Sequence, residues 1–190
     1  MCNFLQSIPL EIYAVLLWWT ITIISLYIWF HLWKKQIKTQ KCYEATLNFI
    51  EAVVKYHESI KYVRHSWMPV SEYWPYIDDS SKWYFKWISY AYEKRWGKIK
   101  DTRTDLTDKK IVFELVTWLN LNDNLRNIYD KQWDLLVHLQ TYLDWLRWER
   151  DSRYEHSIVF WLSDDSDTFD QEIKNQVEQI KTILKPYLFQ

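Results

Sequence analysis

The sequence predicts an all-α fold, with a single N-terminal transmembrane helix followed by a helical bundle on the inner side of the membrane. Residues 12–33 contain no charged side chain, and the chain of 190 residues contains one glycine, where average usage of about 7% would give roughly thirteen. Tight hairpin turns need glycine at positions of positive φ, so this composition favours helices joined by polar loops. We expect four parts: a short outer-side N-terminus (1–11), a transmembrane helix (12–33), a membrane-proximal stalk helix (34–65) and a helical domain (66–190).

The segment 12–33 has the length and chemistry of a membrane span. Its 22 residues measure about 33 Å as a helix, and a bilayer core is about 30 Å thick. The few Ser and Thr hydroxyls can return hydrogen bonds to the backbone one turn earlier. A cleaved signal peptide is the main alternative, but residues 1–11 contain no Lys or Arg, whereas a signal peptide begins with a basic region.

Lysines directly after this segment predict its orientation. Four of them follow within eight residues, and no basic residue precedes the segment. The positive-inside rule then places the C-terminal domain in the cytoplasm of a bacterium, or in the matrix if the membrane is the mitochondrial inner membrane. Trp33, Lys34 and Lys35 are the expected anchors at the inner interface.

Within the span, four side chains share one face. Trp18, Thr22, Ser25 and Trp29 are spaced i, i+4, i+7 and i+11, which places them on one side of a helix. We interpret this face as a docking surface for a neighbouring membrane protein, with lipid contact as the alternative.

Helical spacing continues after the span. Apolar residues from Ala45 to Tyr56 predict a helix that reaches about Arg64, before a break rich in Pro, Asp and Ser. A second helix is expected over 81–97, ended by Gly97 at the C′ position. The alternation of aromatic residues in that segment leaves a strand as the rival interpretation.

Three further helices are expected in the remainder of the chain. The polar segment 101–110 is predicted to be a connector. A helix is expected to follow it, from Ile111 to the Asn-rich segment near residue 120, and a longer helix is expected over about 125–150. A short apolar run near 156–162 has no clear type. Thr168, with Gln171 three residues later, indicates a capping box that begins a final helix stopped by Pro186. An apolar stripe along this helix is expected from Ile173, Val177, Ile180 and Leu184.

No motif predicts catalysis, a cofactor or a metal. The five histidines include no i, i+4 pair, His57 and His65 are expected to be exposed, and the acidic run 163–172 lacks the glycine of a calcium loop. Nucleotide sites need Gly-rich turns, and the net charge of −1 gives no case for nucleic acid. No small-molecule substrate is indicated, and Cys2 and Cys42 are expected to be free thiols on opposite sides of the membrane.

The abundance of aromatic residues points to contacts with other proteins. The chain has 14 Trp and 14 Tyr, and Trp, Tyr and Arg are enriched where proteins bind one another; an aromatic-rich core is the alternative. The candidate partner-binding residues are Trp83, Trp87, Arg95, Trp145, Arg147, Trp148 and Arg150.

The sequence therefore favours a non-catalytic, single-pass membrane protein that acts as an accessory, scaffolding or assembly subunit of a larger membrane complex. Its expected partners are the lipid bilayer and other membrane-protein subunits, and an energy-transducing complex of an inner membrane suits this layout. A membrane-tethered signalling or defence regulator that binds a soluble partner is the second hypothesis. An enzyme of unknown type is the third.

Overall fold

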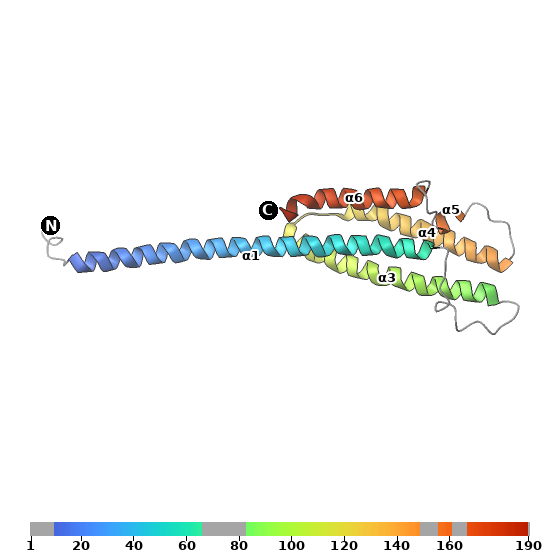
Figure 1. The fold of residues 1–190 in the computed structure, drawn as a ribbon, viewed down its shortest axis with the longest axis horizontal. Coiled ribbons are helices and arrows are strands. Elements are labelled where there is room, and N and C mark those ends of the chain that lie inside the picture. Colours follow the sequence, from blue (N-terminus) through green and yellow to red (C-terminus); the bar gives the residue numbers. More distant parts are fainter. Residues whose placement is uncertain (1–9, 66–82, 149–155, 161–166, 190) are drawn as a thin grey trace. The chain divides into compact units, whose positions relative to one another are not determined.

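The computed structural model describes residues 10–65, 83–148, 156–160 and 167–189. These residues form helices and contain no strand, which confirms the all-α prediction (Figure 1). The helices are α1 (Leu10–Arg64), α3 (Trp83–Thr117), α4 (Asn122–Trp148), α5 (His156–Val159) and α6 (Thr168–Leu188).

The chain divides into two compact units, residues 1–41 and residues 42–190. Helix α1 contributes to both units and ends at Arg64, where the sequence predicts the end of a helix. Its residues 42–64 belong to the second unit, together with the later helices. In the second unit, the later part of α1 lies beside α3, α4 and α6 to form a helical bundle (Figure 1).

A continuous apolar core fills the bundle. Each long helix supplies side chains spaced three, four or seven residues apart, so that one face of the helix is buried. Phe49 of α1 stacks on Phe113 of α3 with ring centroids 5.3 Å apart, and Phe113 meets the ring of Tyr187 of α6 at 6.0 Å. Full burial of such a side chain stabilises the fold by about 1.5–3 kcal/mol. The α6 stripe predicted from the sequence is buried as expected: Ile173, Val177, Ile180 and Leu184.

Helix α3 contradicts two predictions. Gly97 does not end a helix, and the polar segment 101–110 is not a connector, because α3 runs through both as far as Thr117. The physical reason is a sparse apolar face: Ile99, Leu106 and Phe113 recur every seven residues, and all three are fully buried. Leu106 is the one buried residue of the polar segment 101–110 and holds it against the core. Polar contacts add to this, since the Thr102 hydroxyl lies 2.8 Å from that of Ser59 and Arg103 donates to Gln132.

The turn after α3 uses an unusual residue. Trp118 has a φ of 61°, in the left-handed region, and its N–H donates to the carbonyl of Glu114 at 2.8 Å. This hydrogen bond closes the helix as a glycine C-cap does. A bulky residue in this conformation costs about 1–2 kcal/mol. Leu121 N–H then donates to the Glu114 carboxylate at 3.2 Å, which positions the chain for α4.

The start of α6 differs from the prediction by one residue. Asp167, and not Thr168, is the N-cap, and its carboxylate accepts a hydrogen bond from the Asp170 N–H at 3.0 Å. Pro186 does not stop the helix, which continues to Leu188. The short apolar run of uncertain type contains α5, one helical turn.

Replacement of Gly97 by Ala tests the helical assignment. Gly97 lies inside α3, its φ is not positive, and a Cβ added there meets no atom within 4 Å. Alanine should therefore stabilise the bundle by about 0.5–1 kcal/mol, because glycine loses more backbone freedom on folding. Denaturant unfolding of the full chain in mild detergent, compared with the native chain, measures this difference.

The matched control is Lys100→Ala on the exposed side of the same helix, which should change the free energy of unfolding by less than about 0.5 kcal/mol. A destabilising Gly97→Ala would show that this residue adopts the left-handed conformation of a helix C-cap, and α3 would then end near it.

Candidate functional site

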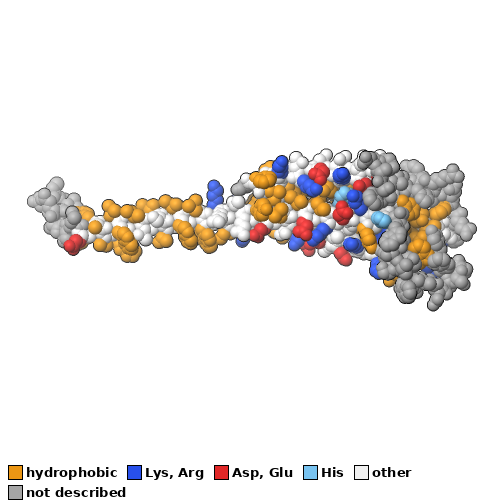
Figure 2. Space-filling view, in the orientation of Figure 1, with side chains coloured by type: hydrophobic (Ala, Val, Ile, Leu, Met, Phe, Trp, Pro, Cys, Tyr) orange, Lys and Arg blue, Asp and Glu red, His pale blue; other side chains and the backbone are white. Residues whose placement is uncertain are grey.

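The first unit exposes an uninterrupted apolar helix surface. Among the described residues, α1 is the one helix long and apolar enough to cross a membrane, and none of its most apolar stretch is buried by the rest of the chain. Hydrophobic side chains cover this part of α1 (Figure 2). Thr20 and Thr22 donate their hydroxyls to the carbonyls of Leu17 and Trp18, at 2.8 and 2.9 Å. Each hydroxyl is therefore satisfied without water, as an apolar surrounding requires.

The predicted docking face and interface anchors all lie on this exposed segment. Trp18 and Trp29 are exposed, Thr22 is half-buried, and Ser25 is exposed. Near the end of the segment the Trp29 and Trp33 rings stack at 6.0 Å, and the Lys34 ammonium lies 4.5 Å from the centre of the Phe30 ring. Lys35 is also exposed. Aromatic rings beside lysines are typical of the boundary between acyl chains and headgroups.

The partner-binding candidates have different positions. Trp87 and Trp145 are partly buried and pack against the core, and Arg147 is exposed. The side chains of Trp83 and Trp148, and the whole of Arg150, lie outside the described residues.

Arg95 is buried, which contradicts its assignment to an exposed binding surface. Its side chain is 1% exposed, and its guanidinium donates to the backbone carbonyls of Val63 and His65 at the end of α1. It also lies 5.0 Å from the centre of the Tyr62 ring. Arg95 therefore binds α3 to the C-terminal end of α1, where helix carbonyls lack intrahelical partners.

In the described part of the second unit, two exposed tryptophans were not among the predicted partner-binding residues. Trp118 is 88% exposed after α3, and Trp133 is 65% exposed on α4 together with Val137 one turn later. The buried side of α4 follows the register 125, 128, 132, 135, 139 and 142. That spacing is visible in the sequence and leaves Trp133 and Val137 outside it.

A buried ion pair joins α1, α5 and α6. Arg64 and Asp167 are both almost completely buried, with the Arg64 Nη2 3.0 Å from a carboxylate oxygen of Asp167. Arg64 also donates through Nε to the carbonyl of Ile158 at 2.6 Å and lies 4.5 Å from the centre of the Phe169 ring. The guanidinium at the end of α1 therefore has a hydrogen bond to α5, and ionic and aromatic contacts with the start of α6.

His57 is buried beside this ion pair, and the expectation that it is exposed is wrong. Its Nε2 lies 3.0 Å from a carboxylate oxygen of Asp170, and the Lys61 ammonium lies 3.6 Å from the other oxygen. The carboxylate belongs to the first turn of α6, so this cluster also ties α1 to α6. His65, expected to be exposed, is half-buried.

A second polar contact crosses the bundle interior. The Tyr56 hydroxyl donates to the side-chain oxygen of Gln132, which also accepts from Arg103 at 3.4 Å. Burial raises the pKa of Tyr56, although nearby Arg103 opposes the shift. The neutral hydroxyl is therefore the state that packs in the core, and the contact links α1, α3 and α4.

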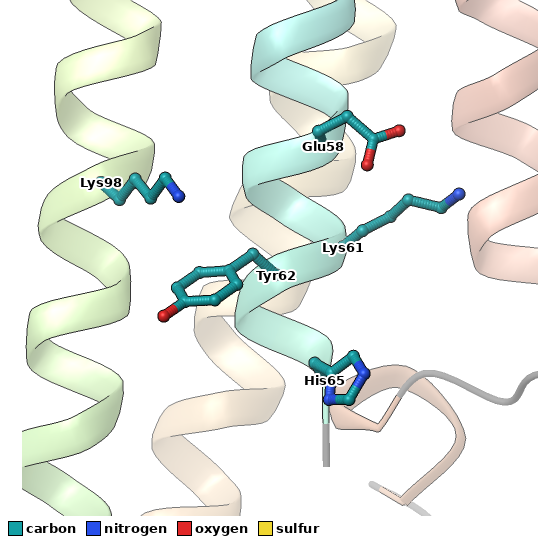
Figure 3. A pocket seen from close by; sticks show the side chains of 5 residues that line it. All are labelled: Glu58, Lys61, Tyr62, His65 and Lys98. Carbon is teal, nitrogen blue, oxygen red and sulfur yellow. The ribbon is translucent and has the colours of Figure 1, made fainter. Parts of the chain in front are cut away.

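A shallow cavity of about 350 Å³ lies beside the end of α1 (Figure 3). The labelled side chains do not converge: the Lys98 ammonium lies 4.4 Å from the centre of the Tyr62 ring, while Glu58 and Lys61 point away from it. No group of three His, Cys, Asp or Glu side chains in the described parts of the chain has the geometry to hold a metal ion. Cys42 is a buried free thiol.

The chain was compared with protein families, curated proteins and solved structures. No family model, curated protein or solved structure matches it.

The contribution of the Arg64–Asp167 ion pair can be measured with two substitutions. Asp167→Asn keeps an oxygen that can accept from the Asp170 N–H but leaves the buried Arg64 without its counter-charge. It should cost about 3 kcal/mol of folding stability. Asp167→Ala also removes the cap and should cost about 1 kcal/mol more. Chemical unfolding of both variants in the same detergent gives the two differences.

Glu172→Gln is the control, because Glu172 forms an exposed ion pair with Lys131 between the same helix and α4. Its loss should cost less than about 1 kcal/mol. Equal stability of Asp167→Asn and the native chain would mean that the apolar stripe and the Asp170 contacts hold α6 without the buried ion pair.

Proposed function

We propose that this chain is a non-catalytic, single-pass membrane protein that acts as an accessory, scaffolding or assembly subunit of a larger membrane complex. The observation that carries the proposal is the exposed apolar surface of residues 12–33, present in a chain whose other unit has a complete apolar core of its own. Water disfavours such a surface, at roughly 25 cal/mol for each Å² of apolar area. A bilayer, or the spans of neighbouring subunits within it, would cover it.

The lysines after Trp33 support an orientation with the N-terminus outside and the bundle inside. All four are exposed, and no acidic residue accompanies them before Glu44. The membrane is then a bacterial plasma membrane or the mitochondrial inner membrane, and the bundle occupies the cytoplasm or matrix.

The bundle would contact a neighbouring subunit through the outer side of α4. Trp133 and Val137 are exposed there at i, i+4 spacing, and exposed Trp side chains are common centres of protein interfaces. In the membrane, the face containing Trp18, Thr22, Ser25 and Trp29 would dock on a partner span.

The buried polar side chains support a structural rather than a catalytic role. Arg64, Arg95 and His57 each connect two or more helices of the bundle. Tyr56 does the same through Gln132. We assign these groups to holding the bundle together.

A membrane-tethered signalling or defence regulator is the alternative, and it would use the same α4 surface to bind a soluble partner. Purification in mild detergent separates the two proposals. Stable co-migration with other membrane proteins supports the subunit, whereas co-migration with a soluble protein supports the regulator.

Removal of residues 1–33 tests the membrane anchor. The full chain should resist carbonate extraction from membranes, and a chain that begins at Lys34 after an initiating Met should move to the soluble fraction. The intact mass of the membrane-bound chain should include residues 1–33, because the segment is an anchor and not a cleaved signal peptide. A shortened chain that still resists carbonate, or a mature chain lacking this segment, would contradict the proposal.

Two tryptophans on α4 distinguish an interface from the core. Trp133→Ala should leave the melting temperature almost unchanged and weaken binding of the co-purifying partner by at least about 2 kcal/mol, or thirtyfold. Trp145→Ala should instead lower folding stability by about 3 kcal/mol, since Trp145 packs against the core and stacks on Tyr142 at 5.7 Å. Full retention of the partner by Trp133→Ala would remove the α4 surface from the proposal.

A further inference from the structure

One end of the bundle carries exposed apolar side chains. Phe113 of α3 contacts both Phe49 of α1 and Tyr187 of α6, so these helices meet where α3 and α6 end and α4 begins (Figure 1). Hydrophobic side chains gather at this end on the face drawn in Figure 2. We call the following exposed residues the apolar end: Leu47, Ile111, Val112, Leu115, Trp118 and Phe189.

Helix α3 supplies most of this surface. Ile111 and Leu115 are spaced four residues apart on α3 and share one side of the helix. Trp118 follows directly after the helix end. Phe113, which lies between them in the sequence, points into the core instead. Leu115 is 69% exposed and Phe189 is 79% exposed. Groups of large apolar side chains at this exposure mark contacts with a membrane or another protein.

Trp118 indicates that the surface has a role outside the fold. Its φ of 61° is one that glycine or asparagine adopts easily and that a bulky residue adopts at a cost. Its ring is 88% exposed, so the described part of the chain gives it little contact in return. Glycine would make the same turn with less strain, and the tryptophan ring is therefore not explained by the turn.

We propose that the apolar end docks on the surface of the membrane that residues 12–33 cross, with its side chains at the boundary between headgroups and acyl chains. This inference rests on the proposed membrane anchor. Only residues 34–41 separate the span from the bundle, and these eight residues are part of helix α1, so they measure about 12 Å. Along α1, the apolar end near Phe49 follows this short connection, whereas the opposite end of the bundle follows only at Arg64.

The charges near the apolar end fit a lipid surface better than a second copy of the chain. The connection contributes four exposed lysines and no carboxylate, and exposed Lys185 lies in the last turn of α6. On α1, exposed Glu44 and Glu51 flank Leu47, and Glu51 is paired with Lys55. Anionic headgroups attract the lysine cluster, and Trp and Phe beside it suit the interfacial layer. Two copies that met through this end would bring the same lysines together and repel each other.

Nitroxide labels on the full chain test the proposal. Leu115→Cys and Phe189→Cys are labelled in a Cys2→Ser, Cys42→Ala background and reconstituted in vesicles of phosphatidylcholine and phosphatidylglycerol. Lys174→Cys is the matched control, because it is exposed on α6 about 22 Å from Phe189. The ratio of collisions with oxygen to collisions with a water-soluble nickel complex reports immersion of each label.

Labels at 115 and 189 should show a ratio severalfold higher than the label at 174. The difference should shrink in vesicles of phosphatidylcholine alone, where the headgroups carry no net charge. Equal ratios at the three positions, in a chain that floats with the vesicles and resists carbonate, would overturn the docking and leave the anchor intact. A chain that does not float would overturn both. Strong spin–spin broadening at 115 would assign this end to a second copy and overturn the lipid contact.

Trp118→Gly separates the docking from the fold. The substitution removes the ring and suits the positive φ, so the melting temperature should stay the same or rise. Immersion of the label at 189 should decrease. A lower melting temperature with unchanged immersion would show that Trp118 serves only the bundle and would overturn its assignment to the membrane surface.

Discussion

The buried contact between Arg64 and Asp167 is the interaction on which the arrangement of the bundle depends. Burial of two charges costs several kcal/mol for each ion unless other groups satisfy them. Here the guanidinium also donates to the Ile158 carbonyl and lies over the Phe169 ring, and the Asp167 carboxylate also accepts from the Asp170 N–H. One carboxylate thus holds the last residue of α1 and begins α6. The start of α6 is fixed against the end of α1, and the apolar stripe of α6 meets the core in a defined register.

The near-absence of glycine explains how the remaining turns are made. The single glycine lies inside α3 and makes no turn. Polar side chains instead satisfy the helix ends: Glu114 accepts from the N–H of Leu121, and Asn120 accepts from the N–H of Asn122. Where a positive φ is needed, Trp118 adopts it. The backbone is therefore strained at a position where most proteins place glycine. The turn does not explain why an exposed tryptophan ring is present there.

Local spacing was sufficient to predict α1 and the buried stripe of α6, because their apolar residues recur within the helix itself. Local spacing was insufficient for α3, where Leu106 is the one buried residue in the polar segment 101–110. How much Leu106 stabilises the helix depends on which residues of other helices cover it. The burial of His57 was likewise unpredictable, since its partner Asp170 is 113 residues away in the sequence. The prediction that Arg95 binds a partner was wrong for the same reason. Arginine is common at interfaces, but only the fold shows that this side chain binds the end of α1. The all-α class and the exposed apolar helix required no such long-range information.

The abundance of tryptophan has three different physical meanings in this chain. Trp145 packs against the core, and Trp18 belongs to the exposed apolar helix. Trp133 lies on the exposed side of α4, opposite the buried residues of that helix. An indole ring suits all three places because it combines a large apolar area with one N–H donor. The number of tryptophans therefore carries no information about binding, whereas their exposure does. A ring already covered by its own bundle has little apolar area left for a partner. The surfaces that remain for lipid and protein contacts are those whose burial contributes nothing to the folding of the second unit.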